Sequence, residues 1–587
     1  MYKNYVSTYS STVTKPDKRY DYIIVGAGTA GCVLAARLSE DPQVKVLLVE
    51  AGDHMGFLTN IPMTSTAAQL GPNDWSVHTT PQKYSSFGLW NQTQILPRGK
   101  GLGGSGQMNF LLHGFGLPQD YDAWVEKGFE GWSLKDLKPY FIKAFGTVLN
   151  EFDSSYCKKG SPCASAPMKL KLVEDENELM QVFKRASASL GGKSTVFRRA
   201  TATVSEGLRH SSLDGYLKPA MNRPNLHVLL NTQAVSIRFD NLTASSLYIL
   251  QNHRNLDNIF VDREIILSAG AIKTPQLLIL SGIGPRDVIK RLKINLVVEN
   301  EHVGSNFHDH MNMPIYVSIK KPISVTLAKV FSAGTLWDYI WRREGLLSFP
   351  PVAGVEYHNS SAVMLFSMGS TSERLLRDLS NYKQQAFRAT FPFAQESRRE
   401  GFVWLNSCAQ PRSRGRVELP SPASSRPPLL RATYLQHEHD LRCTVQAIRR
   451  AERLVATKPF QEIGARIHWP RPERCLSFWN YPIEEQTGVK SRRKRAGGGR
   501  RARVGGGSPP DAFVECVVRE VAVTGHHAAG TCAPPRVLDA HLRVRNVSGL
   551  RVMDASVLPS PLSLYPNSVL IAMAEKAADL IRNSPRP

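Results

Sequence analysis

Two adjacent histidines stand in the stretch TGHHAAGTCA, residues 524–533, near the end of a chain of 587 residues. Histidine titrates near neutral pH, so such a pair can act as an acid/base group, bind a metal ion or lie hydrogen-bonded in a core. Adjacent histidines lack the i, i+4 spacing that places two ligands on one helix face, and no nearby cysteine or carboxylate cluster completes a ligand set. We therefore expect no metal site, and nothing local separates the other two roles.

A second chemical motif lies in residues 21–52, DYIIVGAGTAGCVLAARLSEDPQVKVLLVEAG. An apolar strand, YIIVG, leads into a glycine-rich turn, an apolar-periodic helix over about 29–39, and a second strand, KVLLVE, that ends at Glu50. This order predicts a βαβ unit. An acidic residue in the place of Glu50 can accept hydrogen bonds from a ribose hydroxyl pair, so the unit predicts dinucleotide binding.

The glycines of this turn each have a physical role. Gly26 permits the tight turn, Gly28 lets the backbone approach a pyrophosphate, and Gly31 lets helix and strand pack closely. Thr29 and Ala30 begin the helix, whose N-terminus presents its positive dipole end to the phosphates. The motif alone does not separate FAD from NAD.

Two further stretches suggest close contact with a large ligand. Residues 96–122, LPRGKGLGGSGQMNFLLHGFGLPQDYD, place Gly103, Gly104 and other glycines inside ordered apolar sequence, which favours close backbone approach to a planar or phosphorylated ligand over a flexible linker. Residues 270–284, GAIKTPQLLILSGIG, follow the strand-like REIILSA and predict a turn that feeds a helix with a glycine cap.

With the N-terminal βαβ unit, these stretches resemble the glucose-methanol-choline (GMC) oxidoreductases, FAD-dependent enzymes acting on alcohols. Residues 270–284 fit the second signature of that family at every position, and residues 96–122 fit the first apart from His113, where an aromatic residue or alanine is usual. The resemblance includes HSSLDGYLKPAMNRPNLHVLLN, VGSNFHDH, PRSRGRVEL and GLRVMDAS…AEKAADLI, and spans about residues 20–582. Insect glucose-dehydrogenase-like and choline-dehydrogenase-like members are similar, without singling out a substrate.

The resemblance implies FAD as the cofactor and assigns its contacts. The positions matching the ADP-binding part include the glycines of the first turn and Glu50. Ser105 and Asn109 match positions beside the flavin, and Val235 matches a position at the adenine end. Asp554 and Ala555 match the place where the chain returns toward the pyrophosphate and ribityl chain. We expect non-covalent FAD, because the flavin-side loop 99–112 contains no histidine or cysteine.

FAD that contacts both ends of the chain implies a discontinuous domain. We expect an α/β fold in which a Rossmann-like FAD-binding domain over 20–310 is completed by 539–587, with an α+β substrate-binding domain over 311–538.

A Gly-rich basic insertion at 488–510 is expected to be disordered or to come from translated non-coding sequence. Its eight Lys and Arg account for much of the net charge of +23, which falls to +15 without them. This distribution argues against nucleic-acid binding, although polyanion binding by the insertion stays an alternative.

The family resemblance also decides between the histidines. The base of such enzymes is the histidine of an H-x-x-G-T run, and this register selects His527. Successive side chains of extended backbone point to opposite faces, so His526 is expected to be packed or hydrogen-bonded away from the flavin. The second catalytic position matches Asn567, whose amide would hydrogen-bond the substrate oxygen. A helix N-cap is the structural alternative for Asn567, and both roles are compatible.

These assignments predict an enzyme that oxidises a small-molecule alcohol or sugar. Hydride would go to flavin N5 and the hydroxyl proton to His527, with a quinone or oxygen as electron acceptor. Departures from the family pattern are Ala528, where a proline often follows the base, and LSLYPN in place of a glycine-asparagine turn. The alternative is a flavin-binding protein without turnover, in a binding or structural role.

The compartment stays open. The first 22 residues are polar and lack the apolar core of a secretory signal, so the chain would be extracellular only if a signal is missing from this end and otherwise cytoplasmic. No apolar run reaches the roughly 18 residues needed to span a bilayer. Eight cysteines are too few for a disulfide-built scaffold of this size, and we expect Cys157 and Cys163 to be free thiols.

Overall fold

The computed structural model describes residues 10–66, 68–148, 162–173, 178–192, 194–251, 255–479, 508–563 and 565–584. Cys157 and most of the basic insertion, 488–507, lie outside the described residues. The expectations for the thiol pair and for the insertion therefore stay predictions. No helix of the described part is both long and apolar enough to cross a membrane.

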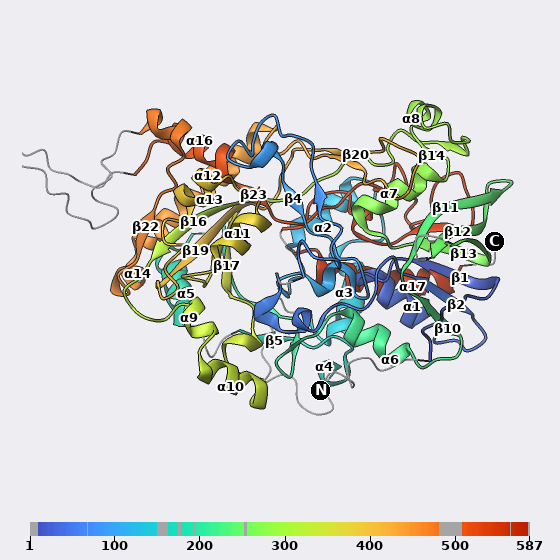
Figure 1. Cartoon of the computed structure of the whole chain (residues 1–587), viewed down its shortest axis with the longest axis horizontal. Coiled ribbons are helices and arrows are strands. Elements are labelled where there is room, and N and C mark those ends of the chain that lie inside the picture. Colours follow the sequence, from blue (N-terminus) through green and yellow to red (C-terminus); the bar gives the residue numbers. More distant parts are fainter. Residues whose placement is uncertain are drawn as a thin grey trace, which may run out of the picture.

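The first sheet has the expected βαβ unit at its centre (Figure 1). Its strand order is β10-β2-β1-β13-β12-β11, and β24 also pairs with β13. The strands β10, β2, β1, β13 and β24 run parallel, whereas β11 and β12 add an antiparallel edge. These strands cover β1(Arg19–Val25), β2(Val46–Val49), β10(Leu226–Leu229), β11(Thr232–Asp240), β12(Thr243–Gln251), β13(Asn255–Leu267) and β24(Leu550–Val552).

Helices from both ends of the chain cover this sheet. The apolar run of β2 is buried at every residue, as expected for a parallel strand with helices on its faces. The helix α1(Thr29–Leu38) packs on α17(Asn567–Arg582), which in turn packs on α3(Leu134–Phe145). Arg37 of α1 donates to the buried carboxylate of Glu575 on α17, at 2.9 and 2.7 Å. The C-terminal segment thus packs on α1 through α17 and adds the strand β24 to the first sheet.

The second sheet is antiparallel. Its order is β22-β16-β19-β18-β17-β6, with β23 also paired to β16. Its helices include α13(Glu438–Val455), which packs against β18 and β19, and α5(Glu178–Leu190), which packs against β17. The strands cover β6(Thr195–Arg199), β16(Met311–Ser318), β17(Val352–His358), β18(Ser361–Phe366), β19(Gly401–Cys408), β22(Arg466–His468) and β23(Val523–Thr524). Strand β6 comes from the segment expected in the first domain, so the two domains interleave more than once along the sequence.

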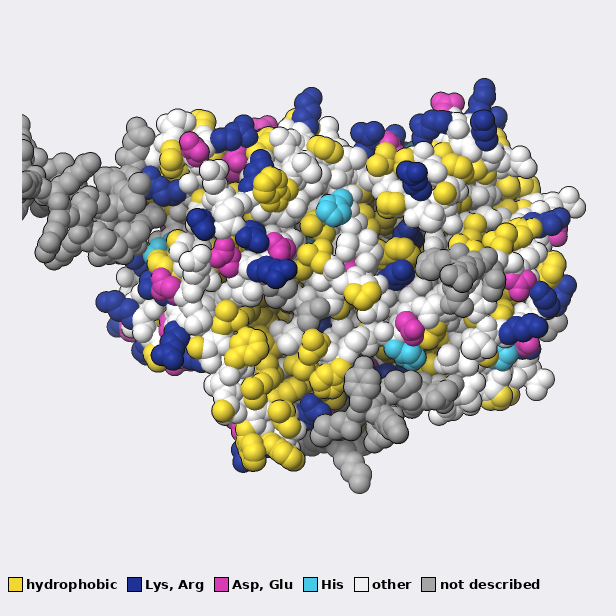
Figure 2. Space-filling view, viewed as in Figure 1, with side chains coloured by type: hydrophobic (Ala, Val, Ile, Leu, Met, Phe, Trp, Pro, Cys, Tyr) yellow, Lys and Arg dark blue, Asp and Glu magenta, His cyan; other side chains and the backbone are white. Residues whose placement is uncertain are grey.

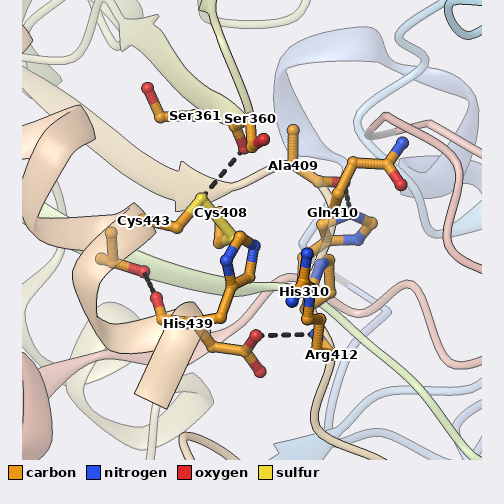
Figure 3. Close-up of a disulfide and its surroundings, with 12 residues drawn as sticks. His310, Ser360, Ser361, Cys408, Ala409, Gln410, Arg412, His439 and Cys443 are labelled. Atoms are coloured by element: carbon orange, nitrogen blue, oxygen red, sulfur yellow. Dashed lines mark hydrogen bonds between the residues drawn. A yellow bond between two sulfur atoms is a disulfide. The ribbon is translucent and has the colours of Figure 1, made fainter. Parts of the chain in front are cut away.

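Two disulfides reinforce the second domain, and neither was predicted from the sequence. Cys408, at the end of β19, is bonded to Cys443 on α13 (Figure 3). The other bond joins Cys475 in the 3-10 helix η9(Glu473–Phe478) to Cys516 on α16(Asp511–Val521). The ring of His439 lies near the first bond, and the three possible ligand atoms lie within 4.8 Å of one another. The two sulfurs are bonded to each other, so they are not thiolate ligands.

An apolar patch lies over the helix α10(Ala333–Arg342), at the lower end of the view in Figure 2. Trp337 and Trp341 on this helix are 60% and 66% exposed. Tyr339 between them is buried and donates its hydroxyl to the Gly207 carbonyl. The helix therefore turns a tryptophan face to the surface.

Candidate active site

A cavity of about 500 Å³ connects the two sheets. The β1–α1 turn and the start of α7(Gly270–Leu280) line one end, and strands of the second sheet line the other. His526, His527 and Asn567 also line this cavity. The catalytic residues chosen from the sequence are thus brought to one place, although about 40 residues separate the histidines from Asn567.

The nucleotide end has the features that the βαβ motif predicts. Glu50, directly after β2, accepts the backbone N–H of Ala27 at 2.8 Å and that of Gly52 at 2.9 Å. Burial raises the pKa of this carboxyl group. No side chain caps α1 at Gly28, so the first N–H groups of the helix stay available to an anion, and its first residues, including Thr29, line the cavity.

The glycines of the two motifs have two different roles, lining the cavity and allowing close packing. Gly28 and Gly104 line the cavity and also touch each other, because a Cβ on Gly104 would lie 2.7 Å from the Cα of Gly28. Gly31 does not line the cavity: a side chain there would strike the Gly26 carbonyl, which confirms its packing role. Gly103 does not line it either, and donates its N–H to the Ala27 carbonyl at 2.8 Å.

Most of the other predicted cofactor residues also line the cavity. Ser105, Asn109, Asp554 and Ala555 do, whereas Val235 does not. The neighbouring β11 residues Thr232, Gln233 and Ala234 line it instead.

The carboxylate of Asp554 organises the start of α7. It accepts the N–H of Gly270 at 2.8 Å, the hydroxyl of Thr274 at 2.5 Å and the N–H of Ser556 at 2.7 Å. Gly270 lines the cavity, and a Cβ there would meet nothing within 4 Å. The space in front of this turn can therefore hold a large group such as FAD.

His527 is held from two sides. Its backbone N–H donates to Asp309 at 2.7 Å, and its ring Nδ1 lies 3.0 Å from the ring Nδ1 of His310. Asp309 also accepts the hydroxyls of Tyr434 at 2.6 Å and Thr524 at 2.5 Å, which fixes the turn that precedes the histidines. Nε2 of His527 has no hydrogen-bond partner among the residues that the structure describes.

The hydrogen bonds of His310 determine the proton position on His527. Nε2 of His310 lies 3.1 Å from the Ala409 carbonyl, which can only accept, so this nitrogen carries the proton (Figure 3). Nδ1 of neutral His310 is then an acceptor, and Nδ1 of His527 must donate to it. The remaining nitrogen of His527, Nε2, is left with a free lone pair. Burial, followed by the nearby His310, lowers the pKa of His527 well below its ordinary value.

The extended backbone expected at His526 is wrong. Its backbone is left-handed, with φ +63°, rather than extended, so the alternation of side chains does not apply and both histidines line the cavity. The His526 carbonyl accepts from the Arg98 guanidinium at 2.6 Å. Burial, followed by the positive charge of Arg98, lowers the pKa of His526 to about 3.

Asn567 is the first residue of α17, and the N-cap role that was the structural alternative for this residue is not observed. The cap is Pro566, and no side chain caps this helix. The Asn567 Oδ1 instead accepts the hydroxyl of Thr29 at 2.9 Å. This bond orients the amide, since its oxygen is occupied and its NH₂ group is left as a donor for the cavity.

Three residues of the site were missed from the sequence. Asp309 and His310 lie in VGSNFHDH, a stretch that carries the family resemblance, but only the fold shows that they contact His527. Tyr565, in the divergent LSLYPN stretch, lines the cavity with its ring centre 6.3 Å from that of His527. His113, the residue that departs from the first family signature, is buried. Its ring forms a hydrogen bond with the Ser568 hydroxyl at 2.9 Å, which is a packing role.

Comparison with known families identifies the chain. Residues 20–312 and 411–574 match the two family models described as GMC oxidoreductase. The chain belongs to the GMC oxidoreductase family. It is therefore a flavin oxidoreductase with FAD as its cofactor, which confirms the resemblance found in the sequence motifs.

Full-length relatives and solved structures agree with this assignment. The chain is 35% identical to the neither inactivation nor afterpotential protein G of Drosophila melanogaster, covering 96% of this chain and 91% of that protein. It is 31% identical to the FAD- and quinone-dependent glucose dehydrogenase of Drosophila melanogaster, covering 97% and 88%.

Among solved structures, pyridoxine 4-oxidase from Mesorbium loti has a TM-score of 0.75 at 23% identity, covering 97% of this chain and all of that one. A formate oxidase of Aspergillus oryzae has a TM-score of 0.78 at 22% identity, covering 97% and 99%. These two likenesses confirm the two-domain α/β fold.

Proposed function

We propose that this GMC oxidoreductase oxidises the CH–OH group of a small-molecule alcohol, with His527 as the general base. One observation carries the proposal: the bond from His527 Nδ1 to His310 leaves the lone pair of His527 Nε2 free in a ring that lines the cavity. A neutral imidazole nitrogen in this position can take the proton of a substrate hydroxyl. FAD supplies the hydride acceptor when bound.

Asn567 has the complementary role. Its amide NH₂ donates to the substrate oxygen, because Thr29 occupies its carbonyl oxygen. A donor here holds the oxygen near His527 and directs the carbinol C–H away from the base. Tyr565 and residues of the second sheet line the cavity, and we expect them to limit the access of water to the substrate.

The residues present favour non-covalent FAD. The loop 99–112 contains no histidine or cysteine, and no cysteine lines the cavity among the residues that the structure describes. The two free cysteines of the described part, Cys32 and Cys532, are buried, and burial raises the pKa of both thiols, which makes them poor nucleophiles. The electron acceptor is a quinone or oxygen, and reoxidation kinetics with each will identify it.

Anaerobic mixing of the purified flavoprotein with an alcohol panel tests this function. We expect the visible absorbance of the oxidised flavin to bleach with at least one alcohol. A protein that binds flavin, but that no alcohol in a broad panel reduces, would support the alternative of a flavin-binding protein without turnover. Polyanion binding by the basic insertion concerns residues outside the described part, and its deletion tests that idea separately.

A further inference from the structure

One face of the second sheet forms the far wall of the cavity. In β16, β18 and β19 alternate residues line it, as the period of two in a strand requires. The pairing of these strands arranges six of them in two rows that cross the sheet: Pro314, Leu405 and Met364, then Tyr316, Val403 and Phe366. The wall is therefore continuous across three strands.

The intervening residues face the other way. Leu365 of β18 and Trp404 of β19 are paired with each other, fully buried, and absent from the cavity lining. Trp404 packs its ring against Phe183 of α5 and Phe402 of β19. One face of the second sheet thus packs against helices in a buried core, and the other face lines the cavity.

The wall becomes apolar with distance from the histidines. Asn312 of β16 lines the cavity beside β23, the strand that leads into His526 and His527. In the rows beyond it, the hydroxyl of Tyr316 is the one polar side-chain group, and it donates to the Gly369 carbonyl at 2.8 Å. No charged residue of the described part lies in this wall.

Charged lining residues are found elsewhere in the cavity. Glu50, Lys273 and Asp554 belong to the first domain, and Arg98 lies beside His526. Phe391 and Phe393 add aromatic surface next to the two rows. The two rows therefore offer hydrocarbon contact, and the neutral polar lining residues Ser370, Thr371 and Ser380 lie outside them.

We infer that the substrate is a lipophilic alcohol, with one hydroxyl at His527 and a hydrocarbon body against the two rows. This inference rests on the proposed function. A sugar would bury several hydroxyls here without partners, and each would weaken binding about tenfold. Each buried methylene instead strengthens binding about fourfold. In the reaction the C–H bond breaks with its electron pair going to FAD, the O–H proton goes to His527, and a carbonyl forms.

A chain-length series tests the inference on the unaltered holoenzyme. Anaerobic flavin reduction is measured with 1-butanol, 1-hexanol, 1-octanol and 1-decanol, and with glucose and choline. We expect kcat/KM to rise about fourfold per added methylene over part of the series. Faster reduction by glucose would overturn the inference, as would faster reduction by choline, which aromatic side chains could hold as a cation.

A cavity variant and its matched control locate the effect. Val403→Thr adds a hydroxyl to the wall at nearly constant volume, and Val363→Thr makes the same change on the opposite face of β18, away from the cavity. We expect Val403→Thr to lower kcat/KM for 1-decanol several-fold relative to 1-butanol, whereas Val363→Thr leaves this ratio unchanged. An unchanged ratio in Val403→Thr, with full flavin content, would contradict the inference that the hydrocarbon body of the substrate contacts the two rows.

Failure of the proposed function would look different. If no alcohol reduces the flavin, substrate binding is read from the perturbation of the flavin spectrum with the same series. Tighter binding of 1-decanol than of glucose would then support the apolar site without turnover, and the reverse order would overturn it.

Discussion

The ring Nδ1 atoms of His527 and His310 lie 3.0 Å apart, and the Ala409 carbonyl lies 3.1 Å from the other nitrogen of His310. This chain of two bonds selects the tautomer of His527 in which Nε2 has a free lone pair. His310 is a positioning residue in this account, since it acts through His527. The disulfide of Cys408, the residue before Ala409, ties this carbonyl to α13.

Removal of the acceptor on His310 tests the tautomer directly. His310→Leu cannot accept the Nδ1–H of His527, so we expect flavin reduction to slow about 100-fold while flavin content is retained. His310→Asn places an amide oxygen near the lost Nδ1 and should recover part of the rate. Equal rates in the two variants would show that the tautomer does not matter.

The pH dependence follows from the pKa of His527. A general base must be unprotonated to accept a proton. Burial lowers the pKa of His527 well below 6.5, so protonation of His527 inhibits the enzyme only at pH values well below 6.5. We expect kcat/KM to be level from about pH 6.5 to 9 and to fall tenfold per pH unit at some lower pH. An acid limb centred above 6.5 would contradict the assignment.

The hydrogen bond from Thr29 to Asn567 allows two effects to be tested apart: the presence of the Asn567 amide and its orientation. Asn567→Ala removes the donor, and we expect flavin reduction to slow about 100-fold. Thr29→Val keeps the amide but releases its oxygen, so a smaller loss of about threefold to tenfold is expected. Stopped-flow reduction with one alcohol compares the two. A greater loss in Thr29→Val would mean that the hydroxyl of Thr29 has another role, such as cofactor binding.

The two disulfides allow a prediction to be tested with two comparable variants, each lacking one of the bonds. They close 35 and 41 residues, so replacing either pair by serines should lower stability by about 2–4 kcal/mol, measured by denaturant unfolding. The Cys408→Ser/Cys443→Ser variant should also slow flavin reduction, because Ala409 follows Cys408. The Cys475→Ser/Cys516→Ser variant should not. Equal activity in both would show that the first disulfide only stabilises the fold.

Much of the first domain could be predicted from sequence because its signals are local. The βαβ unit has its strands, helix and glycine turn within 32 residues, and the expected helix over 29–39 is observed as α1(Thr29–Leu38). The choice of His527 and Asn567 came from family motifs, and the fold brings them to one cavity. Their catalytic roles stay predictions.

The errors arose where distant contacts decide the structure. His526 was expected in extended backbone, but Arg98, 428 residues earlier, bonds its carbonyl in a left-handed turn. A helix N-cap was the structural alternative for Asn567, but its side chain bonds Thr29 at the other end of the chain. The cavity wall likewise depends on the register between β16, β18 and β19, which no single stretch of sequence reveals.

The central claim is that His527 removes the substrate proton, and His527→Gln tests it most directly. The measurement is the rate of anaerobic flavin reduction by an alcohol that reduces the unaltered protein, with His526→Gln as the matched control. We predict a loss of about 10²–10⁴-fold for His527→Gln at full flavin content, and less than tenfold for His526→Gln. A His527→Gln enzyme that reduces its flavin within a few-fold of the unaltered rate, or a greater loss in His526→Gln, would contradict the account.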